Sequence, residues 1–184
     1  MQIRINSGIY KGRRINLPNT GLRPTSEKVR CAFFDTLFSM INFENRDFLD
    51  IFSGTGAMSF EALSRGFKKA VAIDSNAKSI FQITENAELL GTEKNIHIIQ
   101  KDAFCFNSAD FLNSSFSAIY IDPPYKMSKK MPELIENIIL TGMPDNICVI
   151  GVETGNPFNW QQKDWNIKRK NFGDTFLTFL YNWG

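Results

Sequence analysis

Four residues that could hold a planar amine stand together as Asp122-Pro123-Pro124-Tyr125, directly after the apolar run 117–121. The Asp122 carboxylate and the Pro123 carbonyl can each accept one amine hydrogen, and the two prolines remove competing N–H donors and fix the backbone. The Tyr125 ring offers a face on which a nucleobase can stack. The tetrapeptide therefore predicts a catalytic site for group transfer to an exocyclic amine, with a simple strand-ending turn as the alternative.

The base that such a site would accept is indicated by its first residue. Guanine presents two adjacent donors, N1–H and the N2 amine, which match the carboxylate of Asp122. Adenine presents a donor beside an acceptor, which suits an asparagine amide better. An aspartate can also serve adenine or other amines, so the sequence leaves both choices open.

A second motif lies upstream, where residues 48–57 read Phe-Leu-Asp-Ile-Phe-Ser-Gly-Thr-Gly-Ala. A strand, a glycine-rich turn and a helix start form the usual receptor for a nucleotide-like ligand in α/β folds. Gly54 and Gly56 permit a tight turn and a close ligand approach. The third glycine of a dinucleotide fingerprint and the Walker lysine are both missing, which favours a nucleoside cofactor and argues against ATP hydrolysis.

Acidic residues follow this motif at the ends of successive predicted strands. Asp50 could accept bonds from a ligand amino group, Asp74 could take ribose hydroxyls, and Asp102 could meet an adenine edge. These residues predict a nucleoside cofactor; if it is S-adenosylmethionine, its sulfonium makes the methyl group electrophilic. The predicted cofactor-binding residues are Asp50, Ser53, Gly54, Thr55, Gly56, Asp74, Ser75, Asp102 and Ala103.

These motifs lie in a pattern of alternating strands and helices, which predicts an α/β fold with a mostly parallel sheet. Strands are expected over 47–52, 69–73, 95–100, 117–121 and 147–153, and an antiparallel hairpin is expected over 165–182. Helices are expected over 57–65, 77–90 and 131–140, with a short helical segment around 104–112. Glu61 is expected to support packing or a salt bridge, and His97 to be structural.

The first 45 residues depart from this rhythm. Residues 3–17 predict a small hairpin, and 26–41 an amphipathic helix. We expect a single domain over 1–184, in which 1–45 is an appendage and 46–184 the catalytic core. The appendage is basic, which indicates a polyanionic partner or a solvated face. Lys126, Lys129 and Lys130, after the tetrapeptide, could also meet phosphates of such a partner or lie in a solvated loop.

Composition narrows the class of protein. The 184 residues are 43% hydrophobic, include 17 phenylalanines and carry a net charge of +2, which suits one compact domain. No apolar stretch approaches the roughly 20 residues of a membrane span, and the N-terminus lacks a signal region. Cys31, Cys105 and Cys148 are isolated, which predicts buried thiols in a reducing cytoplasm and no metal site.

The chain resembles the bacterial 16S rRNA guanine-N2 methyltransferases of the RsmD type over almost its whole length. The similar segments are 4–13, 22–30, 48–56, 61–66, 122–125 and 172–175, of which Arg23-Pro24-Thr25-Ser26 and Glu61-Ala62-Leu63-Ser64-Arg65-Gly66 are the most diagnostic. The chain departs from the family's usual pattern at Asn6 and Ile9.

The resemblance implies a Rossmann-like class I methyltransferase, with a seven-stranded mostly parallel sheet, an antiparallel C-terminal hairpin and S-adenosylmethionine as donor. It implies one guanine of the small ribosomal subunit as substrate, and we expect a cytoplasmic monomer without metal or membrane partners. The RNA-binding residues it implies are Arg13, Arg14, Arg23, Thr25 and Arg30.

Two other functions remain open from the sequence. One is an amino methyltransferase that acts on DNA adenine or protein glutamine, although the chain has little room for a target-recognition domain. The other is a non-catalytic assembly factor that kept the fold and binds small-subunit particles.

Overall fold

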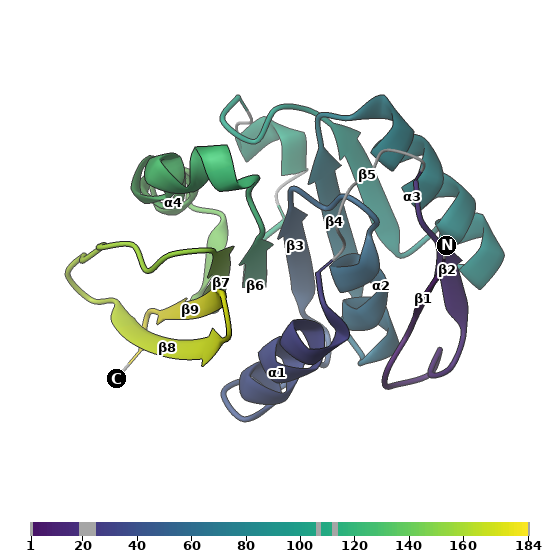
Figure 1. Cartoon of the computed structure of the whole chain (residues 1–184), viewed down its shortest axis with the longest axis horizontal. Helices are drawn as coiled ribbons and strands as arrows, with labels where there is room; N and C mark the ends of the chain where they lie inside the picture. The colour runs from purple at the N-terminus through teal and green to yellow at the C-terminus, as the bar shows by residue number, and fades with distance from the viewer. Residues whose placement is uncertain (1, 19–24, 106–107, 112–113, 184) are drawn as a thin grey trace.

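The computed structural model describes residues 2–18, 25–105, 108–111 and 114–183. Its centre is a seven-stranded sheet in the order β5-β4-β3-β6-β7-β9-β8, with helices on both faces (Figure 1). The strands are β3 Asp47–Ile51, β4 Lys69–Asp74, β5 Ile96–Gln100, β6 Phe116–Ile121, β7 Pro144–Thr154, β8 Asn166–Phe172 and β9 Thr175–Tyr181. The first five run parallel, and β9 and β8 are antiparallel, so the predicted fold class is confirmed.

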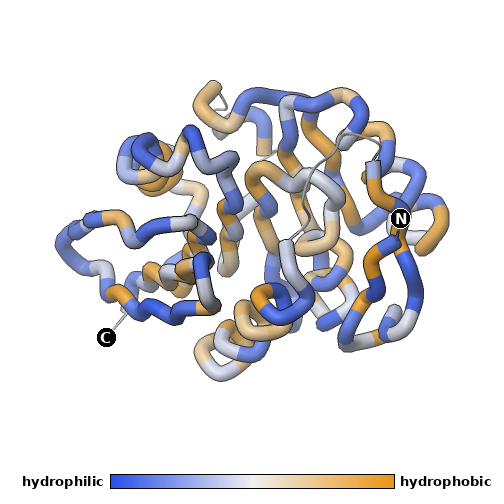
Figure 2. The backbone as a smooth tube through the Cα atoms, viewed as in Figure 1, coloured by the Kyte–Doolittle hydropathy of each residue, from blue (hydrophilic) through white to orange (hydrophobic). Residues whose placement is uncertain are grey.

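The apolar runs of the sequence explain which strands lie centrally. Every residue of β6 is buried, as expected for a parallel strand that is covered on both faces. The edge strand β8 instead carries Lys168, Arg169 and Lys170, and its middle is hydrophilic (Figure 2). Charges on an exposed edge oppose pairing with another chain.

The helices divide between the two faces of the sheet. They are α1 Glu27–Phe38, α2 Ala57–Ser64, α3 Ala77–Leu90 and α4 Met131–Leu140, with the short 3-10 turns η1 Ser108–Phe111 and η2 Tyr125–Lys130. Helices α1, α2 and α3 share one hydrophobic core with the sheet, and α4 packs in the other. Within the described ranges, no helix has the length and apolarity needed to cross a membrane.

Most predicted boundaries agree with the structure to within a few residues. The exceptions have local causes: α1 ends at Phe38 rather than at residue 41 because Ser39 caps it, and the segment predicted around 104–112 is helical only in η1 among the described residues. Helix α3 agrees with its prediction because Asn76 caps its start and Gly91, at φ 72°, ends it.

The N-terminal appendage contains the predicted hairpin, β1 Gln2–Arg4 and β2 Arg14–Asn16, which pair antiparallel. The hairpin is tied to α3 by two bonds between Asn16 and Asn86, at 2.8 and 2.9 Å. Helix α1 buries Val29, Phe33 and Leu37, as its amphipathic pattern predicted. The appendage thus packs against the core at two separate places.

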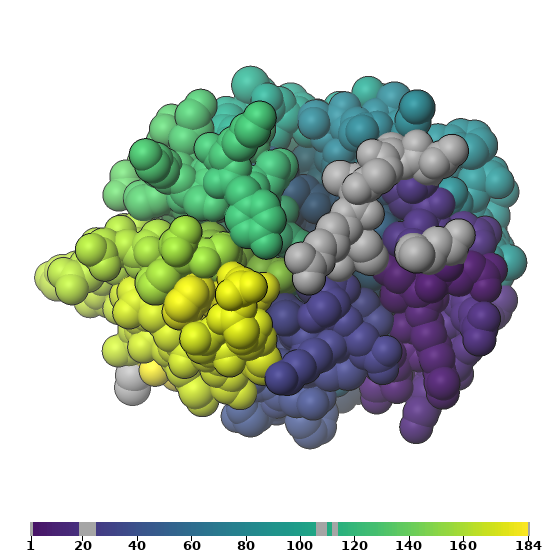
Figure 3. All heavy atoms as spheres, viewed as in Figure 1, coloured from purple at the N-terminus to yellow at the C-terminus, as the bar shows by residue number. Residues whose placement is uncertain are grey.

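Helix α1 also meets the C-terminal strands, which lie beside it in Figure 3. Lys170 Nζ donates to Thr36 Oγ1 at 2.7 Å, and Lys28 Nζ lies 5.8 Å from the centre of the Phe172 ring. The Phe33 ring stacks on Phe179 at 5.8 Å and 7°. These contacts place the start of α1 next to the carboxyl ends of β6 and β7.

Candidate active site

A cavity of about 570 Å³ opens at the carboxyl ends of the parallel strands. It lies where the strand order reverses, because β3 is followed by β4 on one side and has β6 on the other. Open α/β sheets bind ligands at such a switch point. The wall includes the residues before α1, the loops after β3 to β7 and the hairpin between β8 and β9. Both sequence motifs therefore reach one cavity.

The glycine-rich loop after β3 turns through left-handed backbone at Phe52, Gly54 and Gly56, with φ of 63°, 50° and 73°. Ser53, Gly54 and Thr55, three of the predicted cofactor-binding residues, line the cavity, whereas Gly56 does not. A Cβ on Gly56 would lie 2.9 Å from the Phe60 side chain and would clash. Gly56 therefore shapes the loop from behind rather than touching a ligand.

Asp74, at the end of β4, joins the loops that form the floor of the cavity. Its Oδ2 accepts from Gly54 N–H and its Oδ1 from Asn76 N–H, both at 2.8 Å. Two carboxylate oxygens offer about four acceptor directions, so the group can still accept ligand hydroxyls. Asp102 and Ala103 line the cavity after β5, and Ser75 follows Asp74 in the wall.

Asp50 does not take the position that the sequence suggested. Its side chain is only 2% exposed and lies outside the cavity wall. Its Oδ2 accepts from Ser59 N–H at 3.0 Å and from Ser59 Oγ–H at 2.7 Å. Burial raises the pKa of Asp50 to about 7. The prediction of a direct ligand contact is wrong, because α2 covers this carboxylate, which accepts hydrogen bonds from the first turn of the helix.

The tetrapeptide follows β6 into the cavity wall. Asp122 is half-buried, and Thr25 Oγ1 donates to its Oδ2 at 3.0 Å. Burial, helped by the charge of Glu153, raises the pKa of Asp122 to about 8. Pro123 and Pro124 also line the cavity, and the Tyr125 ring is 70% exposed at its mouth. The carboxylate and the aromatic ring therefore share the cavity, as the sequence predicted.

Tyr125 depends on a glycine from another strand end. A Cβ on Gly155 would lie 2.6 Å from the Tyr125 ring, so only glycine lets the ring lie against this backbone. Gly155 follows β7, and the sequence analysis did not single it out. The close approach places the ring next to Glu153 and Thr154, which also line the cavity.

Glu153 is a further acidic residue of the site that sequence reasoning missed. It lies near the end of β7, and Tyr120 Oη donates to its Oε2. Burial and the nearby carboxylates, first that of Asp122, raise the pKa of Tyr120 well above its usual value. The signal was present in the sequence, because Glu153 ends an apolar strand just as Asp74 does.

The five residues predicted to bind RNA have different environments. Arg14 is exposed on β2, and Arg13 is exposed with its Nη2 donating to Leu89 O at 2.6 Å. Thr25 lies in the cavity wall, and Arg23 lies outside the described residues. Arg30 is only 2% exposed. The predicted RNA contact of Arg30 is therefore wrong, because its guanidinium is enclosed by protein.

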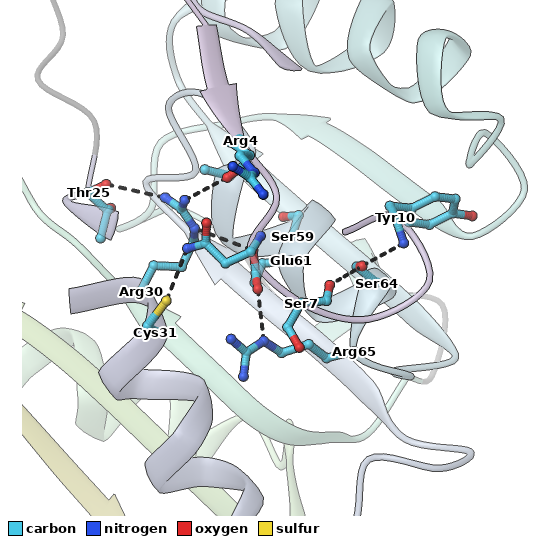
Figure 4. A network of polar contacts seen from close by, with 12 residues as sticks. Arg4, Ser7, Tyr10, Thr25, Arg30, Cys31, Ser59, Glu61, Ser64 and Arg65 are labelled. Carbon is cyan, nitrogen blue, oxygen red and sulfur yellow. Dashed lines mark hydrogen bonds and ion pairs between the residues drawn. The ribbon is translucent and has the colours of Figure 1, made fainter. Parts of the chain in front are cut away.

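Arg30 instead belongs to a buried polar network that joins α1, α2 and the N-terminal hairpin (Figure 4). Its Nη2 donates to Arg4 O at 2.9 Å, and its Nε lies 3.5 Å from Glu61 Oε2. Glu61 also accepts from Asn6 N–H at 2.9 Å and from Arg65 Nε–H at 2.8 Å. The structural role expected of Glu61 is confirmed.

Other sequence expectations have mixed outcomes. Cys148 is buried as predicted, but Cys105 is exposed and Cys31 half-buried, so that prediction is wrong for these two. Cys105 is exposed because it lies in the surface turn after β5 rather than on a strand. In the described part of the chain, no group of three His, Cys, Asp or Glu side chains could hold a metal ion.

The set of residues in the cavity fits a cationic nucleoside ligand. Four acids of the wall, Asp74, Asp102, Asp122 and Glu153, stand against two lysines, Lys28 and Lys101. An excess of carboxylates favours a bound positive charge, and the volume is that of a typical small-ligand site. In the left-handed loop, Gly54 carries no side chain on the cavity wall, so a ligand can approach the backbone closely at this residue.

Comparisons with known proteins agree with these features. The family model described as "Conserved hypothetical protein 95" matches residues 3–181. Ribosomal RNA small subunit methyltransferase D of Escherichia coli K12 is 32% identical over 183 residues, covering 98% of this chain and 89% of the relative. The protein of the same name from Buchnera aphidicola subsp. Acyrthosiphon pisum is 33% identical over 185 residues, covering 98% of this chain and 93% of the relative.

A solved structure has the same fold. The yhhF protein of Escherichia coli superposes with a TM-score of 0.81 at 25% identity, covering 100% of this chain and 99% of that one. The agreement extends from the N-terminal hairpin to the last strand. The chain belongs to the family of conserved hypothetical protein 95, the RsmD family, which its resemblance predicted.

Proposed function

We propose that the protein is an rRNA methyltransferase that moves a methyl group from S-adenosylmethionine to the exocyclic N2 amine of a guanine in the small ribosomal subunit. The observation that carries the proposal is that a single cavity holds both the glycine-rich loop and the Asp122-Pro123-Pro124-Tyr125 segment. Relatives named ribosomal RNA small subunit methyltransferase D support RNA as the substrate class.

The residues of the cavity divide between two tasks. Gly54, Thr55, Asp74 and Asp102 lie where a nucleoside would be held, with Asp74 facing ribose hydroxyls. S-adenosylmethionine supplies an electrophilic methyl group when it is bound. The acids of the wall favour its positive charge, and the bonds from Gly54 and Asn76 to Asp74 keep this part of the cavity rigid.

The tetrapeptide orients the acceptor amine. The lone pair of an exocyclic amine on a nucleobase is delocalised into the ring, so the enzyme must hold the nitrogen in a reactive geometry. The Asp122 carboxylate and the Pro123 carbonyl each accept one amine hydrogen, and the exposed Tyr125 ring stacks on the base. Such positioning lowers a barrier by roughly 7–11 kcal/mol at best.

The ionised form of Asp122 favours guanine over adenine, and Glu153 lines the same part of the cavity. The guanine Watson–Crick edge offers N1–H beside the N2 amine, so carboxylates meet donors. Adenine N1 is an acceptor, which a carboxylate would repel. A site that hydrogen-bonds the correct edge leaves polar groups unpaired with the wrong base, which costs binding energy.

The test is transfer of labelled methyl from S-adenosylmethionine to unmethylated small subunits, free rRNA, DNA and bulk protein. Label recovered as N2-methylguanine in small-subunit RNA is the expected result. Label in DNA or protein would overturn the substrate assignment and keep the chemistry. Binding to small-subunit particles without transfer, unaffected by Asp122→Ala, would instead indicate the assembly-factor function.

A further inference from the structure

The hydroxyl of Thr25 reaches the catalytic carboxylate from a distant part of the chain. Its Oγ1 donates to Asp122 Oδ2 at 3.0 Å, although the two residues are 97 positions apart. The Thr25 side chain is half-buried and belongs to the cavity wall. A phosphate offers only acceptors, so a hydroxyl proton that is directed at Asp122 is not available to an RNA backbone.

We propose that Thr25 is a positioning residue of the methyl transfer: its hydroxyl fixes the orientation of the Asp122 carboxylate and favours its ionised form. This role rests on the function proposed above for the same cavity. It replaces the RNA contact that the sequence predicted for Thr25.

The backbone that follows Thr25 is fixed by hydrogen bonds at the start of α1. Ser26 caps α1 by accepting from Val29 N–H at 3.2 Å, and Arg30 N–H donates to Ser26 O at 3.0 Å. The Arg30 guanidinium is in turn fixed by Arg4 O and by Glu61. This buried network therefore sets the position of the residues just before α1.

The same helix is also packed on the strand that carries Asp122. The Phe33 ring of α1 meets the Tyr120 ring of β6 edge-on, with centres 4.9 Å apart. Tyr120 lies two residues before Asp122, so both side chains point to the same face of the sheet. Thr25 and Asp122 are thus held by elements that pack directly against each other.

A preset donor helps a catalytic carboxylate in two ways. It holds the carboxylate plane before substrate arrives, so that no reorganisation is needed during reaction. It also leaves acceptor directions on both oxygens for the amine, since a carboxylate has about four. A hydrogen bond to the charged form of a group favours that form.

Other groups near Asp122 act in the opposite direction. Burial and the charges of Glu153 on β7 and Asp50 on β3 raise its pKa to about 8, and the Thr25 bond lowers it. Burial and the charges of the same carboxylates raise the pKa of Tyr120 on β6. The other charged residues that line the cavity in the described part of the chain are Lys28 in α1, Asp74 at the end of β4, and Lys101 and Asp102 after β5. Removing Thr25 or Glu153 should therefore shift the pKa of Asp122 in opposite directions.

The direct experiment measures the pKa of Asp122 by carbon NMR of carboxyl-labelled aspartate, with the signal assigned from Asp122→Asn. We expect Thr25→Val to raise this pKa by about one pH unit, the equivalent of one hydrogen bond to a charged group. Thr25→Ser should leave it unchanged, because the hydroxyl is retained. Glu153→Gln should lower it.

The kinetic experiment uses the full chain and small-subunit RNA. Thr25→Val should lower kcat at neutral pH by about tenfold to a hundredfold, move the acid limb of the pH–rate profile upward and leave KM for RNA unchanged. Thr25→Ser should restore the wild-type profile. Thr84→Val, which removes an exposed hydroxyl that bonds Ile80 O on α3, is the matched control.

Two results would overturn the proposal. One is an Asp122 pKa that is the same in Thr25→Val and wild type. The other is a Thr25→Val variant whose only defect is weaker, less salt-dependent RNA binding. The NMR measurement needs no turnover, so it tests the role of Thr25 even in a protein that methylates no RNA. Absence of methylation by wild type would refute the proposed function separately. Thr25→Ala replaces Thr25→Val if the latter does not fold.

Discussion

At the level of single residues, two carboxyl groups near the cavity have raised pKa values but different surroundings. Asp122 faces the cavity and has a pKa raised to about 8, whereas Asp50 lies behind the glycine-rich loop with a pKa raised to about 7. One is placed to touch a substrate amine, and the other is closed off by Ser59. The two acids should therefore respond to mutation in different ways.

Asp122→Asn should abolish most of the methyl transfer while the protein still binds S-adenosylmethionine. The amide keeps one acceptor but directs N–H donors at the amine, so kcat should fall by about two to three orders of magnitude, as for loss of one preorganised hydrogen-bonding group. Calorimetric titration with S-adenosylmethionine measures whether cofactor binding is retained, and single-turnover kinetics measure the loss of methyl transfer. Wild-type kcat in the variant would remove Asp122 from the catalytic machinery.

Asp50 should make folding depend on pH. Its folded pKa of about 7 lies above the ordinary value of 3.8, so between these values the native state binds more protons than the unfolded state. Its contribution to the free energy of unfolding is therefore greatest at low pH and falls as pH rises, at most by about 1.4 kcal/mol per pH unit.

Urea denaturation over pH 4 to 8 tests this expectation for Asp50. The stability of wild type should decline relative to that of Asp50→Asn as pH rises through this range. Asp122→Asn is a useful comparison, because the raised pKa of Asp122 gives a decline of the same sign that extends to about pH 8. Parallel curves for wild type and Asp50→Asn would mean that Asp50 titrates normally.

At the level of elements, α1 packs the N-terminal appendage against α2 and the sheet. Its buried Arg30 pairs with Glu61 of α2, and its phenylalanines pack on the sheet. A basic residue of an amphipathic helix thus serves folding rather than RNA binding. The pair also fixes the helix start that presents Thr25 to Asp122.

Arg30→Met should destabilise the protein by about 3–5 kcal/mol, because it leaves the buried Glu61 with less compensation for its charge. The exposed Arg14→Met is the matched control and should change stability by less than about 0.5 kcal/mol. Chemical denaturation measures both. A loss of RNA affinity in Arg30→Met at unchanged stability would contradict the structural role.

At the level of the whole molecule, exposed basic residues lie in two separate elements, the N-terminal hairpin and η2. Arg13 and Arg14 are exposed on the hairpin, and Lys126, Lys129 and Lys130 are exposed on η2 after the tetrapeptide. These two groups come from opposite parts of the sequence. Both groups are candidates for phosphate contacts with a polyanionic substrate.

Arg14→Ala should weaken binding to small-subunit particles and reduce its salt dependence. Each lost phosphate contact lowers the slope of log affinity against log salt by about 0.7–0.9. Binding measured from 50 to 200 mM salt shows the change, and Lys163→Ala on the loop before β8 provides a control of the same charge. An unaltered slope in Arg14→Ala would move the RNA surface away from the hairpin.

The sequence by itself determined the elements and the two motifs. Apolar runs predicted β3 and β6, which are buried on both faces, and the helix predicted over 77–90 is α3. The glycine-rich loop and Asp122 were found because their roles depend on residues adjacent in the chain. Strand alternation placed their loops at one edge of the sheet, where the cavity lies.

Only the tertiary structure decided which polar side chains meet a ligand and which meet each other. Arg30 and Arg14 look alike in a basic segment, yet one is buried against Glu61 and the other is exposed. Asp50 is enclosed, while Thr25 turns toward Asp122. The physical reason is that burial and hydrogen-bond partners depend on how α1 and α2 pack on the sheet, and that packing joins residues far apart in the chain.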